Sequence, residues 1–147
     1  MIEDLILSNL LHNEGYGRKV IPFLRSKYFQ DRNDRTIYEA VERYVSQYNR
    51  FPNTTAVALD VTEQNTHSAD DVALINERLT NLEPKECDVE WLVDQTEKFC
   101  KERAIYNAIS DSIKILDDKT GKTTPGMIPG LLEEALAVSF DSNIGHD

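Results

Sequence analysis

The stretch from Asp88 to about Asp117 constrains the fold of this chain more than any other. It holds thirty residues without a glycine or a proline. Because these two residue types most often interrupt a helix, one long helix is the simplest interpretation. In its second half the apolar residues cover much more than one stripe of the helix surface. That half is therefore expected to contact more than one neighbour.

A turn and a shorter helix are predicted after this long helix. Residues 119–126 are rich in glycine, threonine and proline, a composition typical of turns. A last helix is predicted from Pro129, in its first turn, to about Phe140. Together the two helices predict a helical hairpin with arms of unequal length.

The first half of the chain predicts a series of short helices. Apolar residues recur at helical spacing in residues 1–12, 33–48 and 68–82, and shorter helices are expected near residues 16–24 and 53–61. The sequence Asn13-Glu14-Gly15 is expected to end the first of them. No alternation of apolar and polar residues is long enough to predict a strand. We therefore expect an all-α fold, with a compact helical head at residues 1–84 and a helical hairpin at residues 85–147.

Composition and charge exclude several classes of protein. The 147 residues fit one domain, and 26 acidic against 16 basic side chains give a net charge of −10. Such a charge argues against non-specific binding to DNA phosphates, which requires Lys and Arg. The longest apolar runs have four residues, whereas a bilayer span needs about 20. Glu3 and Asp4 follow Met1-Ile2, so no secretory leader is expected.

No catalytic, cofactor-binding or metal-ligating residue is predicted. Thr120-Gly121-Lys122-Thr123 is similar to the end of a phosphate-binding loop, but Leu116 stands where that loop needs its first glycine, and a helix precedes it instead of a strand. The three histidines are far apart in the sequence, and the two cysteines lack the spacing of a zinc site. Acidic neighbours such as Glu133-Glu134 point in different directions on a helix, as solvated charges do.

Two surfaces remain as candidates for binding. Basic residues between positions 18 and 35 are typical of a solvated helix rim, and alternatively of a docking patch for an acidic surface. The hairpin carries more large apolar side chains than two helices bury between them, so part is expected to pack on the head and the remainder predicts a subunit interface. The basic residues are Arg18, Lys19, Arg25, Lys27, Arg32 and Arg35. The candidate interface residues are Trp91, Leu92, Phe99, Tyr106, Ile109, Ile113, Leu132, Leu136 and Phe140.

Several short stretches, in a fixed order over the whole chain, carry a family resemblance. They are Ile2 to Leu11, Lys27-Tyr28-Phe29 ahead of Thr36-Ile37-Tyr38, Tyr48-Asn49-Arg50-Phe51-Pro52, Glu90-Trp91-Leu92, Glu97-Lys98 to Arg103-Ala104 with Tyr106-Asn107-Ala108, and Ala135 to Ser142 with Gly145-His146-Asp147. Together they resemble the N-terminal domain of DnaB-type replicative DNA helicases, and most closely the version in T-even-like tailed phages.

The resemblance implies a place in DNA replication. Hairpins of neighbouring subunits are expected to pair into a collar on a hexameric ring, and the collar to serve as a docking platform for primase. ATP and Mg, 5′ to 3′ movement and single-stranded DNA are expected to belong to a RecA-like motor farther along the full-length protein, with no cofactor in this chain. The resemblance places the protein in the cytoplasm of an infected bacterial host, away from membranes. The alternative is a stand-alone acidic helical adaptor or regulator that binds a phage or host protein.

Overall fold

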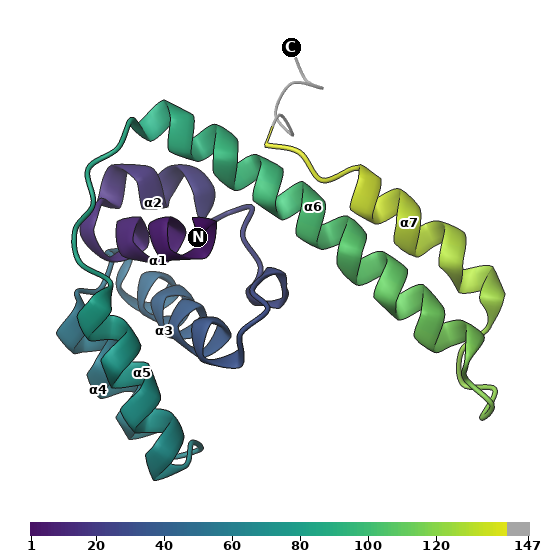
Figure 1. The fold of residues 1–147 in the computed structure, drawn as a ribbon, viewed down its shortest axis with the longest axis horizontal. Helices are drawn as coiled ribbons and strands as arrows, with labels where there is room; N and C mark the ends of the chain where they lie inside the picture. Colours follow the sequence, from purple (N-terminus) through teal and green to yellow (C-terminus); the bar gives the residue numbers. More distant parts are fainter. Residues whose placement is uncertain (141–147) are drawn as a thin grey trace. The chain divides into compact units, whose positions relative to one another are not determined.

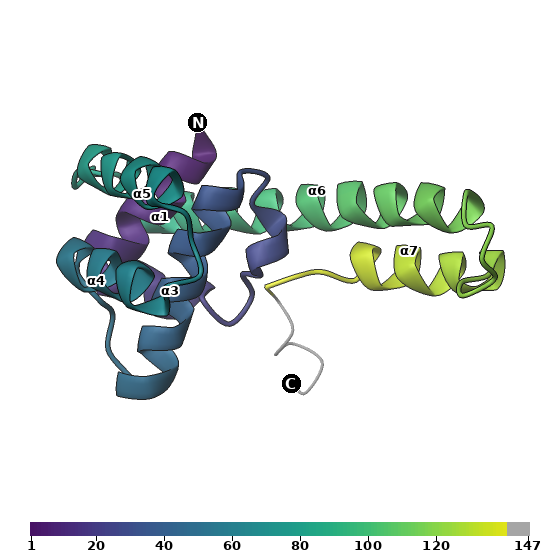
Figure 2. The same cartoon turned by 90° about the horizontal axis from the view of Figure 1, so that it is seen from below.

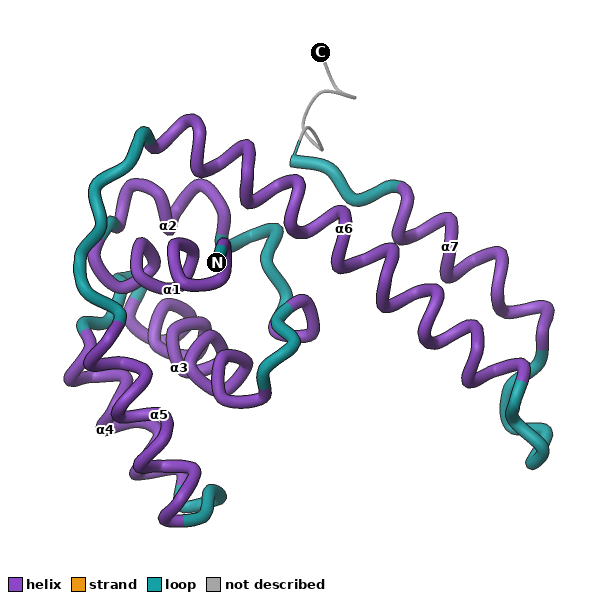
Figure 3. Tube along the Cα trace, viewed as in Figure 1, coloured by secondary structure: helices purple, strands orange, loops and turns teal. Residues whose placement is uncertain are grey.

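The computed structural model describes residues 1–140, and within them every regular element is a helix (Figure 1; Figure 3). The prediction of an all-α fold is confirmed for these residues. The α-helices are α1 (Ile2–His12), α2 (Glu14–Val20), α3 (Arg32–Tyr48), α4 (Thr54–Gln64), α5 (Ala69–Asn81), α6 (Val89–Leu116) and α7 (Ile128–Leu136), and the short 3-10 helices are η1 (Ser26–Tyr28) and η2 (Pro125–Met127).

The chain divides into two compact units, and the division falls inside α6 between Thr96 and Glu97. The first turns of α6 therefore belong to the first unit and the remainder to the second. The boundary near residue 84 and the head and hairpin drawn from it stay predictions. Residues 141–147 of the predicted hairpin, with His146, lie outside the described residues.

Side-chain caps set several of the helix starts. Asn53 and Ser68, the first residues of two predicted helical stretches, accept the backbone N–H groups of Ala56 (2.8 Å) and Asp71 (3.1 Å). Asn13 does the same for α2, with its Oδ1 accepting the N–H of Tyr16 at 3.1 Å. The first helix therefore ends at His12, as predicted, but the cap starts α2 at Glu14, two residues earlier than the predicted residue 16.

Two helices end earlier than the sequence predicts. α2 ends at Val20, ahead of Pro22, whose ring does not fit a helix interior, so the predicted residues 23 and 24 lie outside it. α7 ends at Leu136 and does not reach Phe140. The backbone N–H of Phe140 donates instead to the carboxylate of Glu97 at 2.9 Å. A side chain on α6 thus provides the acceptor that a further helical turn would have supplied.

The core of the first unit surrounds α1. Its residues 6–11 are all buried, so this helix is enclosed around its circumference. The spacing of its apolar residues had predicted that only one face would be buried. Tyr16 and Tyr38 are fully buried in the same unit, and their hydroxyls make hydrogen bonds with Thr96 Oγ1 (2.6 Å) and the Leu24 carbonyl (3.2 Å). Buried aromatic side chains thereby keep their polar atoms satisfied.

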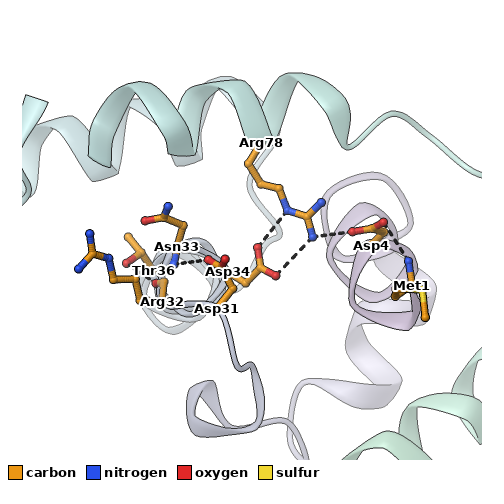
Figure 4. A network of polar contacts seen from close by, with 8 residues as sticks. All are labelled: Met1, Asp4, Asp31, Arg32, Asn33, Asp34, Thr36 and Arg78. Atoms are coloured by element: carbon orange, nitrogen blue, oxygen red, sulfur yellow. Dashed lines mark hydrogen bonds and ion pairs between the residues drawn. The ribbon is translucent and has the colours of Figure 1, made fainter. Parts of the chain in front are cut away.

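One guanidinium group links three helices of the first unit. Arg78 on α5 donates to both carboxylate oxygens of Asp34 on α3, at 3.0 and 3.3 Å, and lies 2.6 Å from the carboxylate of Asp4 on α1 (Figure 4). Only 6% of Asp34 is exposed. The planar guanidinium matches a carboxylate with two parallel bonds, so this arrangement fixes orientation as well as distance.

Burial and charge act in opposite directions on the two carboxyl groups. Burial is the largest influence on Asp34 and raises its pKa above the ordinary value, although the Arg78 guanidinium opposes it. At Asp4 burial is again the largest single influence and acts upward, but hydrogen bonds from the N-terminal ammonium and Arg78 together lower the pKa. Asp34 is therefore the carboxyl group that depends most on Arg78 to stay ionised.

A glycine in α2 makes room for an aromatic ring. A Cβ atom built on Gly17 would lie 2.7 Å from Cζ of Phe51, closer than side chains pack. Arg18, the next residue, places its guanidinium 5.8 Å from the centre of the same ring and donates to the Asn49 carbonyl at 2.9 Å. These contacts hold the loop between α3 and α4 against α2.

Replacement of Arg78 by Met tests the three-helix ion pair. We expect Arg78→Met to lower the free energy of unfolding in urea by about 2–3 kcal/mol, somewhat less than for a fully buried pair because Arg78 keeps part of its side chain in water. The matched control is Arg43→Met, which breaks the more exposed pair with Asp60 and should cost less than about 1 kcal/mol. Equal losses in the two variants contradict a special role for Arg78.

The same variant makes a prediction about pH. Arg78→Met removes the group that opposes burial at Asp34, so the folded-state pKa of Asp34 rises further above its unfolded value of about 3.9. A raised folded-state pKa gives stability that is present below the unfolded pKa and is lost as the pH rises through the folded pKa. The cost of Arg78→Met should therefore be smaller near pH 3.5 than near pH 7, and a cost independent of pH is the contrary result.

Two glycines of α2 provide a matched pair of substitutions. Gly17→Ala should destabilise the chain by about 1–3 kcal/mol, because the new methyl group meets the Phe51 ring. Gly15→Ala adds the same methyl group where the nearest atom is Asn13 Oδ1, at 3.5 Å, and should stabilise α2 by up to about 1 kcal/mol. Thermal unfolding measures the change in stability of each variant. If both variants gain stability, or both lose it, the prediction is contradicted.

Candidate interaction surface of the helical hairpin

In the second unit, α7 runs back alongside the C-terminal part of α6 (Figure 1; Figure 2). At the open end the carboxylate of Glu97 accepts the Phe140 N–H and lies 3.4 Å from the Ser139 hydroxyl, while Lys101 lies 3.6 Å from it. These contacts tie the segment after α7 to α6. The described part of the second unit is therefore a helical hairpin.

The turn of the hairpin is organised by one carboxylate. Asp118 accepts the backbone N–H groups of Thr120 and Thr123, at 2.8 and 2.9 Å, and both threonine hydroxyls. These hydrogen bonds hold the pKa of Asp118 well below its usual range. Gly121 has a φ of +78°, which favours glycine. The Thr120–Thr123 sequence, similar to a phosphate-binding loop, is thus part of an aspartate-centred turn.

Small side chains form the inner side of the hairpin. Ala104, Ala108 and Ser112 follow one another at intervals of four along α6 and are all buried, and Ala135 is buried on α7. The Ser112 hydroxyl donates to the Ala108 carbonyl at 2.7 Å, so no polar group is left unsatisfied there. Of the large apolar side chains that α6 carries in the second unit, Phe99 and Ile115 are buried as well.

Four other large apolar side chains of α6 lie on an exposed face. Tyr106, Ile109, Ile113 and Leu116 are 50–64% exposed, and their spacing of three, four and three places them on one side of the helix. We call these four residues the α6 stripe. Arg103, one turn before it, places its guanidinium 4.4 Å from the centre of the Tyr106 ring. A continuous exposed apolar face of this kind is typical of an association site.

The structure divides the nine predicted interface residues into exposed and buried groups. Tyr106, Ile109 and Ile113 lie in the α6 stripe, and Leu136 on α7 is 72% exposed, whereas Leu92 and Phe99 are buried. Trp91 is 47% exposed and belongs to the first unit, and Leu132 and Phe140 are half-buried. The sequence interpretation omitted Leu116, although it continues the spacing of the stripe, and Met127, which is 50% exposed.

Most of the basic patch has structural contacts within the first unit. Arg18 pairs with Glu14 and Arg32 pairs with Asp71, both at 2.8 Å. Arg25 and Arg35 donate to backbone carbonyls, at 2.8–3.0 and 2.7–2.8 Å. Lys19 and Lys27 are exposed. The arginines therefore stabilise local structure in addition to any contact with a partner.

Within residues 1–140 no three histidine, cysteine or acidic side chains are grouped so as to hold a metal ion. In the same range, no helix has both the length and the apolar character that crossing a membrane requires.

Comparison with known proteins gives one informative relative. No protein-family model matches the chain. The chain is similar to a DnaB-like replicative helicase of Enterobacteria phage T4, with 30% identity over a 152-residue alignment. The alignment covers 98% of this chain and 32% of the helicase, so the chain spans about a third of that relative's length. The predicted resemblance is confirmed, and the share of the relative that is covered is consistent with an N-terminal domain.

Proposed function

Because almost the whole chain is related to a DnaB-like replicative helicase, we propose that it is the N-terminal collar domain of a phage replicative helicase. In this role it joins neighbouring subunits and docks primase. The observation that supports the proposal is the α6 stripe, whose four large apolar side chains are exposed to water. It lies on a chain that is similar to a replicative helicase. Association removes this apolar surface from water, at a gain of roughly 25 cal/mol for each Å² buried.

A second copy of the hairpin is the partner that best fits the α6 stripe. The stripe follows the a and d positions of a short heptad pattern, from Tyr106 to Leu116. If two copies pair antiparallel about a twofold axis, Tyr106 meets Leu116 and Ile109 meets Ile113 of the second copy. In the same arrangement Arg103 faces Asp117 of the second copy, twice. A parallel pair instead brings Lys98 next to Arg103, so charge favours the antiparallel arrangement.

The remaining functions of the parent protein are assigned to parts beyond this domain. ATP-dependent movement along single-stranded DNA in the 5′ to 3′ direction is proposed for a motor domain in the full-length helicase. No residue of the present chain is assigned to that chemistry. The alternative, a stand-alone acidic adaptor, is supported less well, because the relative is named as a helicase and the similarity extends over 98% of the chain.

Two isoleucines of the α6 stripe provide the test of self-association. Ile109→Asp combined with Ile113→Asp should shift the chain to a monomer in size-exclusion chromatography with light scattering, because the charges would have to be buried in the contact. The wild-type chain is expected to associate at high micromolar concentration. Both positions are about half exposed, so circular dichroism should show unchanged helix content.

The control for this change is Leu74→Asp, which places a charge at a 51%-exposed leucine of α5 outside the hairpin. It should leave the oligomeric state unchanged. The orientation is tested by Arg103→Asp, which should weaken association, and by adding Asp117→Arg in the same chain, which should restore it. A wild-type chain that stays monomeric contradicts self-association through the hairpin.

Primase docking is tested on the exposed lysines of the basic patch. Lys19→Glu with Lys27→Glu should weaken binding of the cognate primase by about tenfold in low salt, if the patch meets an acidic surface. The two lysines are chosen because both side chains are exposed. Lys122→Glu, in the hairpin turn, is the control. If the double variant binds primase as tightly as the wild-type chain does, the basic patch is a solvated helix rim and not a docking site.

A further inference from the structure

A hollow lies between two helices of the first unit, away from the α6 stripe. It has a volume of about 430 Å³ and lies between the C-terminal half of α3 and α4, which pack against one another. Its apolar lining comes from Tyr44, Tyr48 and Leu59, and its polar lining includes Arg43, Asp60 and Glu63. We call it the α3–α4 groove. A volume of this size is within the range of natural binding clefts.

The apolar side chains of this groove are available for contact. Tyr48 is 49% exposed and Leu59 is 57% exposed, so neither is needed to fill the core. The rings of Tyr44 and Tyr48 lie 4.8 Å apart at a tilt of 50° and form one aromatic surface. Tyrosine in a concave site is among the residues that contribute most to binding energy in protein interfaces.

The charge around the groove favours a basic partner. The charged side chains that line the groove are Arg43, Asp60 and Glu63, one cation against two anions. At the groove itself, Arg43 forms an ion pair with Asp60, which cancels its charge, and Glu63 is exposed beside them. A partner with lysine or arginine is therefore attracted, and its cations can also lie over the tyrosine rings.

The shape favours a helix as the occupant. Tyr44 and Tyr48 are one turn apart on α3, and Leu59 and Glu63 are one turn apart on α4, so the lining follows both helices. A furrow between two packed helices accepts the ridge of a third helix. We propose that the α3–α4 groove binds a short basic amphipathic helix of a partner protein, with apolar anchors between the tyrosines and Leu59.

A pair of synthetic peptides tests the proposal. One is an amphipathic helix roughly 15 residues long, with leucine and tryptophan on one face and lysine on both flanks, and the other is a twin with glutamate in place of lysine. The basic peptide should shift the ¹⁵N–¹H resonances of residues 44, 48, 59 and 63. Fluorescence polarisation should show it binding at least about tenfold more tightly than the acidic twin.

Matched variants separate the groove from other surfaces. Leu59→Ala should weaken binding of the basic peptide, whereas Leu74→Ala, at an equally exposed leucine on α5, should not. Glu63→Lys should reduce the preference for the basic peptide, whereas Glu77→Lys, on α5 and outside the groove, should not. The proposal is overturned if neither peptide binds, if both bind equally, or if the shifts fall on the α6 stripe. Shifts there assign peptide binding to the stripe and not to the groove.

Discussion

The first unit depends on the ion pairs of a single guanidinium. Arg78 reaches from α5 to Asp34 on α3 and to Asp4 on α1. Of these helices, α1 is the one that the core encloses. Apolar packing is not directional, so it brings three helices together without fixing their rotation. Two parallel bonds to a largely buried carboxylate fix it. The α3–α4 groove depends on the same helix, because the C-terminal half of α3 forms one of its sides.

The second unit leaves much of its large apolar surface exposed to water, unlike a self-contained domain. Ala104, Ala108 and Ser112 are buried together with Phe99 and Ile115, while the four large side chains of the α6 stripe face water. Small residues let two helices approach closely but remove little apolar area from water. A hairpin built in this way gains most of its burial from a partner, which agrees with the proposed role as a joining element. The Asp118 turn and the Glu97 contacts keep the hairpin closed without a large core.

The two proposed surfaces differ in chemistry as well as in place. The α6 stripe is aliphatic with one tyrosine, and its flanking charges, Arg103 and Asp117, are complementary to those of a second copy. The α3–α4 groove has two tyrosines and one carboxylate, Glu63, in excess of its cations, which suits a different and basic protein. Self-association and partner binding can therefore occur on the same chain without competition for the same residues.

The sequence by itself determined the helices, because caps, prolines and apolar spacing are local. The absence of glycine and proline over thirty residues predicted α6, and Asn53 and Ser68 marked the starts of α4 and α5. The α6 stripe was also largely predictable, since Tyr106, Ile109 and Ile113 share one face. Only the tertiary structure decided that Leu92 and Phe99 are core residues, that α1 is enclosed, and that Arg78 pairs with Asp34. These facts depend on which elements meet, and pairings between residues as distant as 34 and 78 leave no periodic signal in the sequence.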